Sequence, residues 1–330
     1  MNFRVLEDRG QHFLLTYDGK KTWLGELNGR LKKRAVEEKP TTGDLVRGVL
    51  QPGDWINIEE VLPRKNLLVR QAAGMQELQK LGANIDYLFV AMAMNQDFNL
   101  TRLDRYISMS LACHIQPVVV LTKADLAEDP YHLLDQTGGR FPNLEIHAIS
   151  VKEGWNLDSL QKYLQPGLTV ALVGSSGVGK STLTNCLVGS DILDTGEIRE
   201  DDGKGKHTTS FRSLHLLENG AWIMDTPGLR SLALWSAEEG LSQLFEDIEA
   251  LRLKCRFNDC RHESESGCQI LQALETGAIE EERWQSYLKL KREQDFLKRK
   301  TDKAAESRQK EVWKKRTKQF RQKLKGSNYY

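Results

Sequence analysis

The sequence has few cysteines and no long hydrophobic run. Only five cysteines occur among its 330 residues, too few for a disulfide-stapled scaffold. The longer apolar runs, such as LTVALVG at 168–174, fall well short of the roughly 18 residues that a membrane span requires. The first ten residues, MNFRVLEDRG, are charged and lack the apolar stretch of a signal peptide. We therefore expect a globular cytoplasmic protein with no membrane partner.

The chain has almost no net charge, but its charges are distributed unevenly. Its 47 basic and 46 acidic residues give +1. Residues 291–330 contain 15 Lys or Arg and 5 Asp or Glu, a net of +10, which leaves −9 for residues 1–290. Trp313, Phe320, Tyr329 and Tyr330 are interleaved with the basic residues, which suits a helix lying along nucleic-acid phosphates. A solvated charged face is the alternative.

The first 80 residues contain short apolar runs separated by turn sequences. This pattern is typical of a small β-barrel or sandwich. A basic cluster at 29–34 (GRLKKR) would lie in a loop, either solvated or in contact with RNA. The expected strands are at 13–17, 22–27, 44–50, 54–62 and 66–70.

From residue 81 to about 235, longer apolar runs of buried-strand type alternate with helical patterns. Such alternation predicts a parallel sheet covered by helices on both faces. Helical patterns occur at 103–112 and 181–189, and the chain after Leu234 again has a helical pattern. The expected strands are at 85–94, 116–122, 144–150, 168–174 and 221–226.

The strongest motif is a phosphate loop that fits GxxxxGK[ST]. It follows an expected strand and precedes an expected helix, as such a loop requires. Its backbone N–H groups can surround a β-phosphate at the N-terminus of the helix. Lys180 can reach the β- and γ-phosphates in a catalytic role, and Ser181 can ligate Mg²⁺. The predicted nucleotide-binding residues here are Gly174, Ser175, Ser176, Gly177, Val178, Gly179, Lys180, Ser181 and Thr182.

Two further segments suit the γ-phosphate and Mg²⁺. Asp225-Thr226-Pro227-Gly228 ends an expected strand, so Asp225 can hold the Mg²⁺ hydration shell and Gly228 can offer its N–H to the γ-phosphate. In Gly205-Lys206-His207-Thr208-Thr209, Thr208 can close over Mg²⁺. Each segment read alone fits an ordinary turn or loop.

A base-recognition motif, Thr122-Lys123-Ala124-Asp125, lies at another strand end. The Asp125 carboxylate can accept hydrogen bonds from guanine N1–H and the 2-amino group. Adenine lacks both donors, so the site would discriminate strongly against it. The Lys123 stem can pack on the base, and Ser150 can support it from the next loop. Together these motifs are the parts of a G protein in an unusual order, because the base motif precedes the phosphate loop.

A third group of residues predicts a metal site. Cys255, Cys260, His262 and Cys268 lie within 14 residues. Three thiolates and one imidazole form the closed tetrahedral set that structural zinc prefers. Free cysteines beside a surface histidine are the alternative.

With these motifs the sequence resembles the RsgA (YjeQ) family of circularly permuted, small-subunit-dependent GTPases. The resemblance implies an oligonucleotide/oligosaccharide-binding (OB) β-barrel, a permuted α/β GTPase domain and a helical zinc domain. It also implies a cytoplasmic factor, expected to be monomeric, that binds the small ribosomal subunit and its rRNA late in maturation and hydrolyses GTP there. The expected divisions are a barrel at 1–80, a GTPase domain at 81–238, a zinc domain at 239–282 and a basic helical extension at 283–330.

Two residues depart from common GTPases. Thr122 replaces an asparagine, although its hydroxyl can still bond a neighbouring loop. Leu229 stands where a glutamine often orients the attacking water, so we expect slow intrinsic hydrolysis that the subunit accelerates. His207 is a candidate for positioning the water, or a plain loop side chain. The rival functions are an RNA-binding scaffold with a nucleotide-sensing, nearly inactive G domain, and an ATP-dependent enzyme such as a small-molecule kinase.

Overall fold

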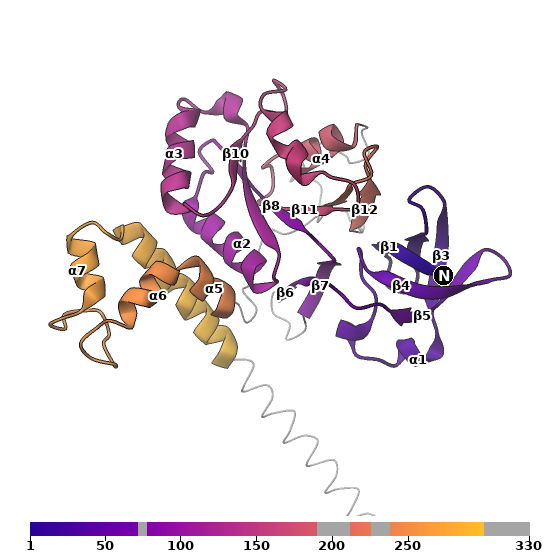
Figure 1. The fold of residues 1–330 in the computed structure, drawn as a ribbon, viewed down its shortest axis with the longest axis horizontal. Coiled ribbons are helices and arrows are strands. Elements are labelled where there is room, and N and C mark those ends of the chain that lie inside the picture. Colours follow the sequence, from indigo (N-terminus) through magenta and orange to yellow (C-terminus); the bar gives the residue numbers. More distant parts are fainter. Residues whose placement is uncertain (72–77, 190–211, 226–237, 300–330) are drawn as a thin grey trace, which may run out of the picture.

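The computed structural model describes residues 1–71, 78–189, 212–225 and 238–299. Three parts lie in a row, with an α/β unit in the middle, a β-barrel on one side and a helical part on the other (Figure 1). In the described ranges, no helix combines the length and apolar character needed to cross a membrane.

The N-terminal part is a closed five-stranded barrel. The strands pair in the order β1-β2-β3-β5-β4, and β4 pairs back with β1. Alternate residues such as Phe3 and Val5 point inward and are buried, which gives the barrel its own core. The OB fold is likewise a five-stranded barrel, so the expected barrel is confirmed. The strands are β1 (Asn2–Asp8), β2 (Phe13–Thr16), β3 (Thr22–Leu27), β4 (Leu45–Gln51) and β5 (Trp55–Val61).

Two details of the N-terminal prediction were wrong. Among the described strands, the apolar run at 66–70 does not join the barrel, because β6 (Leu67–Gln71) pairs with β7 (Leu78–Ala83) in a separate hairpin. The basic cluster at 29–34 begins as a helix, α1 (Gly29–Lys32), rather than as a loop. Asn28 starts this helix by accepting a hydrogen bond from the backbone N–H of Leu31. A 3-10 turn, η1 (Val36–Glu38), follows.

The central sheet has the strand order β10-β9-β8-β11-β13-β12. β12 runs antiparallel to β13, and the other pairs are parallel. All five expected strands of this region are present, whereas β12 was not expected. Both faces are buried, since Leu88 and Phe89 of β8 belong to different core clusters. The strands are β8 (Tyr87–Ala93), β9 (Gln116–Thr122), β10 (Ile146–Ala148), β11 (Thr169–Val173), β12 (Ser213–Leu216) and β13 (Trp222–Asp225).

Helices of the central unit begin at well-defined caps. The Asn99 side chain accepts from the N–H of Arg102 at the start of α2, and Asp129 accepts from the N–H of His132 at the start of α3. Pro130 occupies the first position of α3, where no N–H partner is needed. The elements are α2 (Leu100–Ala112), α3 (Pro130–Arg140) and α4 (Lys180–Val188), with 3-10 turns η2 (Ala124–Leu126) and η3 (Leu157–Tyr163).

The barrel joins the edge of the central sheet. Glu7 of β1 is the register partner of Ser213 in β12, so the two sheets are continuous. At the same junction Met224, in the strand that ends at Asp225, lies against Gly82. A Cβ atom at residue 82 would stand 2.2 Å from the Met224 sulfur. A side chain at residue 82 would displace Met224, so the β6–β7 hairpin is packed closely against β13.

The C-terminal part packs against α2. Gly240 of α5 lies so close to this helix that a Cβ there would stand 2.1 Å from the carbonyl oxygen of Ser108. A buried ion pair joins Asp104 of α2 to Arg140 of α3 at 2.6 Å, and Ser286 donates to the same carboxylate. The elements are α5 (Glu238–Leu244), α6 (Glu246–Arg252), α7 (Gln269–Glu275) and a helix at 281–299.

Candidate nucleotide site and metal centre

The expected phosphate loop connects β11 to α4. Gly174 must be glycine, since a Cβ there would stand 2.5 Å from the carbonyl oxygen of Ala91. Gly177 and Gly179 have φ values of +73° and +94°, which glycine adopts readily. Gly179 precedes α4 and provides no side-chain cap. The first N–H groups of α4 therefore remain for a ligand, and a helix N-terminus favours an anion.

Lys180 folds over this loop. Its Nζ donates to the carbonyl oxygens of Gly174 at 2.9 Å and Ser175 at 2.6 Å. The ammonium group thus lies across the loop that would enclose the phosphates, as a phosphate-binding lysine requires. Ser176 and Ser181 belong to the same strand–loop–helix unit, Ser181 as the second residue of α4.

The base-recognition segment contacts the phosphate loop directly. Thr122, the last residue of β9, is buried and donates from its Oγ1 to the carbonyl oxygen of Val178 at 2.6 Å. Lys123 follows in the left-handed conformation, with φ +58°, and turns the chain toward Asp125. The threonine hydroxyl therefore joins two loops that lie 56 residues apart in the sequence.

A cavity of about 220 Å³ lies between these two loops. The Ser150 hydroxyl donates to Asp125 Oδ1 at 2.6 Å, which orients the carboxylate. The expected residues Thr122, Lys123, Asp125, Gly179 and Thr182 line the cavity together with Leu126, Val151 and Lys152. Those last three were not expected, although Val151 and Lys152 directly follow Ser150 in its loop.

The Mg²⁺ and γ-phosphate residues are described only in part. Asp225 ends β13, which runs parallel to β11. Its carboxylate therefore lies at the carboxyl ends of the strands, the same end of the sheet as the phosphate loop. His207, Thr208, Gly228 and Leu229 lie outside the described residues. A hard carboxylate oxygen and the Ser181 hydroxyl at one sheet edge form a donor set that suits Mg²⁺.

Two charged residues at the phosphate loop were missed. Arg102 Nη1 lies 3.3 Å from Ser175 Oγ and pairs with Asp97 Oδ2 at 2.9 Å. The Ser175 hydroxyl also lies 3.4 Å from Asp97. The hydrogen bond from Arg102 lowers the pKa of the Asp97 carboxyl. Nothing in the local sequence marks Arg102, because its contact depends on the pairing of β8 with β11.

The four expected metal ligands form one cluster. The ligand atoms of Cys255, Cys260, His262 and Cys268 all lie within 4.8 Å of one another. Cys255 Sγ is 4.0 Å from Cys268 Sγ, and His262 Nδ1 is 3.3 Å from Cys268 Sγ. Zinc bound tetrahedrally at roughly 2.3 Å from each sulfur would place two sulfurs about 3.7 Å apart. The spacing of the four ligand atoms is therefore compatible with a metal ion such as zinc.

The thiols of this cluster differ in their pKa values. Burial raises the pKa of Cys255, but hydrogen bonds from the backbone N–H groups of Gln269 and Ile270 and from the neighbouring thiols together lower it below its ordinary value. Burial and the neighbouring thiol of Cys268 raise the pKa of Cys260 to about 11. Metal ligation needs thiolates, so binding would release protons.

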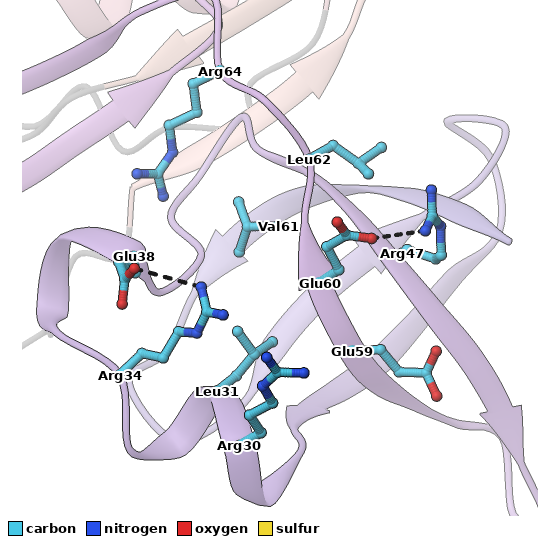
Figure 2. Close-up of a pocket in the computed structure, with 10 residues that line it drawn as sticks. All are labelled: Arg30, Leu31, Arg34, Glu38, Arg47, Glu59, Glu60, Val61, Leu62 and Arg64. Carbon is cyan, nitrogen blue, oxygen red and sulfur yellow. Dashed lines mark hydrogen bonds and ion pairs between the residues drawn. The ribbon is translucent and has the colours of Figure 1, made fainter.

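The barrel carries a separate cavity of about 640 Å³ beside α1 (Figure 2). Arg30 and Arg34 reach it from the basic cluster. Arg34 pairs with Glu38 at 3.4 Å, and Arg47 pairs with Glu60 at 2.7 Å. The cavity therefore has mixed charge, which fits a solvated surface as well as an RNA contact.

Comparison with known proteins decides the family. The RsgA GTPase family model matches residues 61–235. The chain belongs to the RsgA GTPase family. It is 45% identical over 251 residues to the "Small ribosomal subunit biogenesis GTPase RsgA 2" of Vibrio vulnificus, covering 74% of this chain and 72% of that protein. It is 41% identical to the protein of the same name from Lactiplantibacillus plantarum, covering 88% of this chain and 82% of that one.

Two solved structures share the fold. YjeQ from Thermotoga maritima superposes with a TM-score of 0.66 at 25% identity, covering 88% of this chain and 96% of YjeQ. YloQ, described as a circularly permuted GTPase, gives a TM-score of 0.61 at 22% identity, covering 92% of this chain and 95% of YloQ. The expected RsgA architecture of a barrel, a permuted GTPase unit and a C-terminal part with a Cys/His cluster is confirmed.

Proposed function

We propose that this chain is a GTPase that acts in the biogenesis of the small ribosomal subunit, in the cytoplasm. The observation that carries the proposal is the cavity between the base-recognition and phosphate loops, joined by the bond from Thr122 to Val178. The names of the relatives in the RsgA family supply the biological setting.

Guanine would be selected at the Asp125 end of the cavity. Ser150 holds the carboxylate, which would accept from guanine N1–H and the 2-amino group. A buried acceptor left without donors is costly, so adenine would bind poorly. The Lys123 stem would cover one face of the base. This chemistry argues against an ATP-dependent enzyme.

The phosphates would lie at the other end, along residues 174–182. Lys180 and the backbone N–H groups would neutralise the phosphate charge, while Ser181, Thr208 and Asp225 would hold Mg²⁺ directly or through its waters. Gly228 would donate its N–H to the γ-phosphate. Mg²⁺ supplies additional charge neutralisation when bound. Because Leu229 cannot orient water, we expect slow hydrolysis alone and faster hydrolysis on the subunit, with His207 as a candidate to position the water.

The remaining parts would bind RNA and support the GTPase unit. We propose that the barrel, within residues 1–80, and the basic extension at 283–330 contact rRNA, while residues 81–238 form the GTPase domain. One zinc ion would hold the domain at 239–282 together through its Cys/His cluster. We expect the chain to bind the subunit as a monomer.

Co-sedimentation tests this proposal. The chain is mixed with purified small or large ribosomal subunits, with GDP or a non-hydrolysable GTP analogue, and pelleted through a sucrose cushion. We expect binding to small subunits only, and tighter binding with the analogue. Equal binding to both subunits, or to neither, contradicts the proposal. Competition of GTP and ATP against labelled GDP separately tests the ATP-dependent alternative.

A further inference from the structure

Arg102 places a second positive charge at the phosphate loop. Its guanidinium lies 3.3 Å from Ser175 Oγ. The carbonyl oxygen of the same Ser175 accepts from Lys180 Nζ at 2.6 Å. Two cations therefore contact one residue of the loop, Lys180 through the backbone and Arg102 through the side chain.

The fold determines this placement. β8 and β11 are parallel neighbours, with Val90 opposite Val173. Their carboxyl ends lead into adjacent loops, so the start of α2 lies beside the phosphate loop. Asn99 caps α2 and holds the backbone of Arg102 in the first turn. The arginine side chain then extends toward Ser175.

Arg102 is paired with Asp97 at the surface, through Nη1 to Oδ2 at 2.9 Å and Nη2 to Oδ1 at 3.3 Å. The side chains of Arg102 and Asp97 are 31% and 55% exposed. Ion pairs with that much solvent contact contribute little to stability. The guanidinium is therefore anchored beside an anion-binding loop by a bond that a more highly charged group can replace.

We propose that Arg102 is a catalytic residue of GTP hydrolysis, which rests on the proposed GTPase function. When GTP is bound, the guanidinium leaves Asp97 and contacts oxygens of the γ-phosphate. Water forms the new bond to the γ-phosphorus, the bond to the β–γ bridging oxygen breaks, and its electron pair remains on GDP. The proton from water passes to the phosphate product or to solvent. Arg102 stabilises the charge shared among these oxygens, as an arginine supplied in cis does in other GTPases.

The variant Arg102→Ala tests this role. Single-turnover GTP hydrolysis is measured at saturating nucleotide with saturating small subunits, and GDP affinity is measured separately. We expect the rate to fall by roughly 1000-fold or more, while GDP affinity stays nearly unchanged, because GDP lacks the γ-phosphate. Arg102→Lys keeps the positive charge but lacks the planar guanidinium, so its rate should lie between those of the wild type and Arg102→Ala.

Two further variants separate catalysis from loop support. Arg105→Ala is the matched control: Arg105 lies in the same helix with 29% exposure but pairs with Glu293, and its rate should match the wild type. Asp97→Asn weakens the resting pair and should retain at least the wild-type rate. A rate for Arg102→Ala equal to wild type, an equal loss of GDP and GTP affinity with an unchanged rate, or a loss for Asp97→Asn as large as for Arg102→Ala would each overturn the proposal. Wild-type protein without GTP turnover would instead refute the proposed function itself.

Discussion

The Thr122 hydroxyl donates a 2.6 Å hydrogen bond to the carbonyl oxygen of Val178, and both residues are buried. This bond connects the end of β9 to the phosphate loop. It places threonine in the bridging role for which many GTPases use an asparagine at the same motif position. A single side chain, that of Thr122, therefore links the base-recognition segment to the phosphate loop.

Replacing Thr122 by valine removes this bond while keeping the shape of the side chain. The Val178 carbonyl would lose its buried donor, so we expect the free energy of unfolding to fall by about 1–3 kcal/mol. GDP affinity should also decrease because the two loops are no longer held together. Thr122→Ser keeps the hydroxyl and serves as the control. Urea unfolding and GDP titration measure the effects, and an unchanged Thr122→Val protein would show that the bond has no role.

The base preference should follow Asp125. In Asp125→Asn, an amide replaces the carboxylate that would accept from guanine, so we expect GTP affinity to fall by at least about 100-fold. The amide can instead donate to the 2-carbonyl of xanthine, and xanthosine triphosphate should bind better than GTP. Asp135→Asn removes the same charge at an exposed position of α3 and should behave like wild type. Unaltered guanine binding in Asp125→Asn would place the base elsewhere.

The Cys/His cluster should contain one tightly bound zinc ion. Its removal by a chelator should lower the melting temperature, because four ligands from the stretch between α6 and α7 would lose their shared partner. Cys268→Ser should lose the metal, whereas Cys186→Ser, at an exposed site on α4, should keep it. Elemental analysis and thermal unfolding provide the readouts. Purified protein with no zinc would contradict the assignment.

Stability should rise with pH above 8 because of Lys80. Burial, and then the nearby Arg64, lower the pKa of Lys80 to about 8, from an ordinary value of 10.5. Between these values the unfolded chain binds a proton that the folded chain does not, so raising the pH disfavours unfolding. We expect the wild type to gain stability from pH 8 to 10.5 relative to Lys80→Met. The exposed Lys20→Met should show no such difference, and parallel curves for wild type and Lys80→Met would refute the argument.

Much of the fold was predictable because its signals are local. The phosphate loop, the base motif and the metal ligands have fixed residue types at fixed spacing. Strand β1 was missed. Buried and less buried residues alternate at its start, but the alternation stops where its pairing with β2 shifts register after Val5. The run at 66–70 alternates like a barrel strand, and its pairing with β7 depends on a partner that its own sequence does not specify.

The unpredicted parts of the site depend on tertiary contacts. Arg102 reaches a serine 73 residues away only because β8 and β11 are neighbours. Lys152 and Leu126 line the cavity because their loops converge at one sheet edge. The helical pattern at 103–112 does not indicate that Arg102, the residue before it, contacts the phosphate loop.

The central claim is a guanine-specific GTPase that depends on the small ribosomal subunit. Its most direct test is hydrolysis of GTP and ATP by the purified chain, with and without small subunits. We predict slow GTP turnover alone, a many-fold increase with small subunits and no turnover of ATP. Fast GTP turnover that is indifferent to subunits would contradict the account.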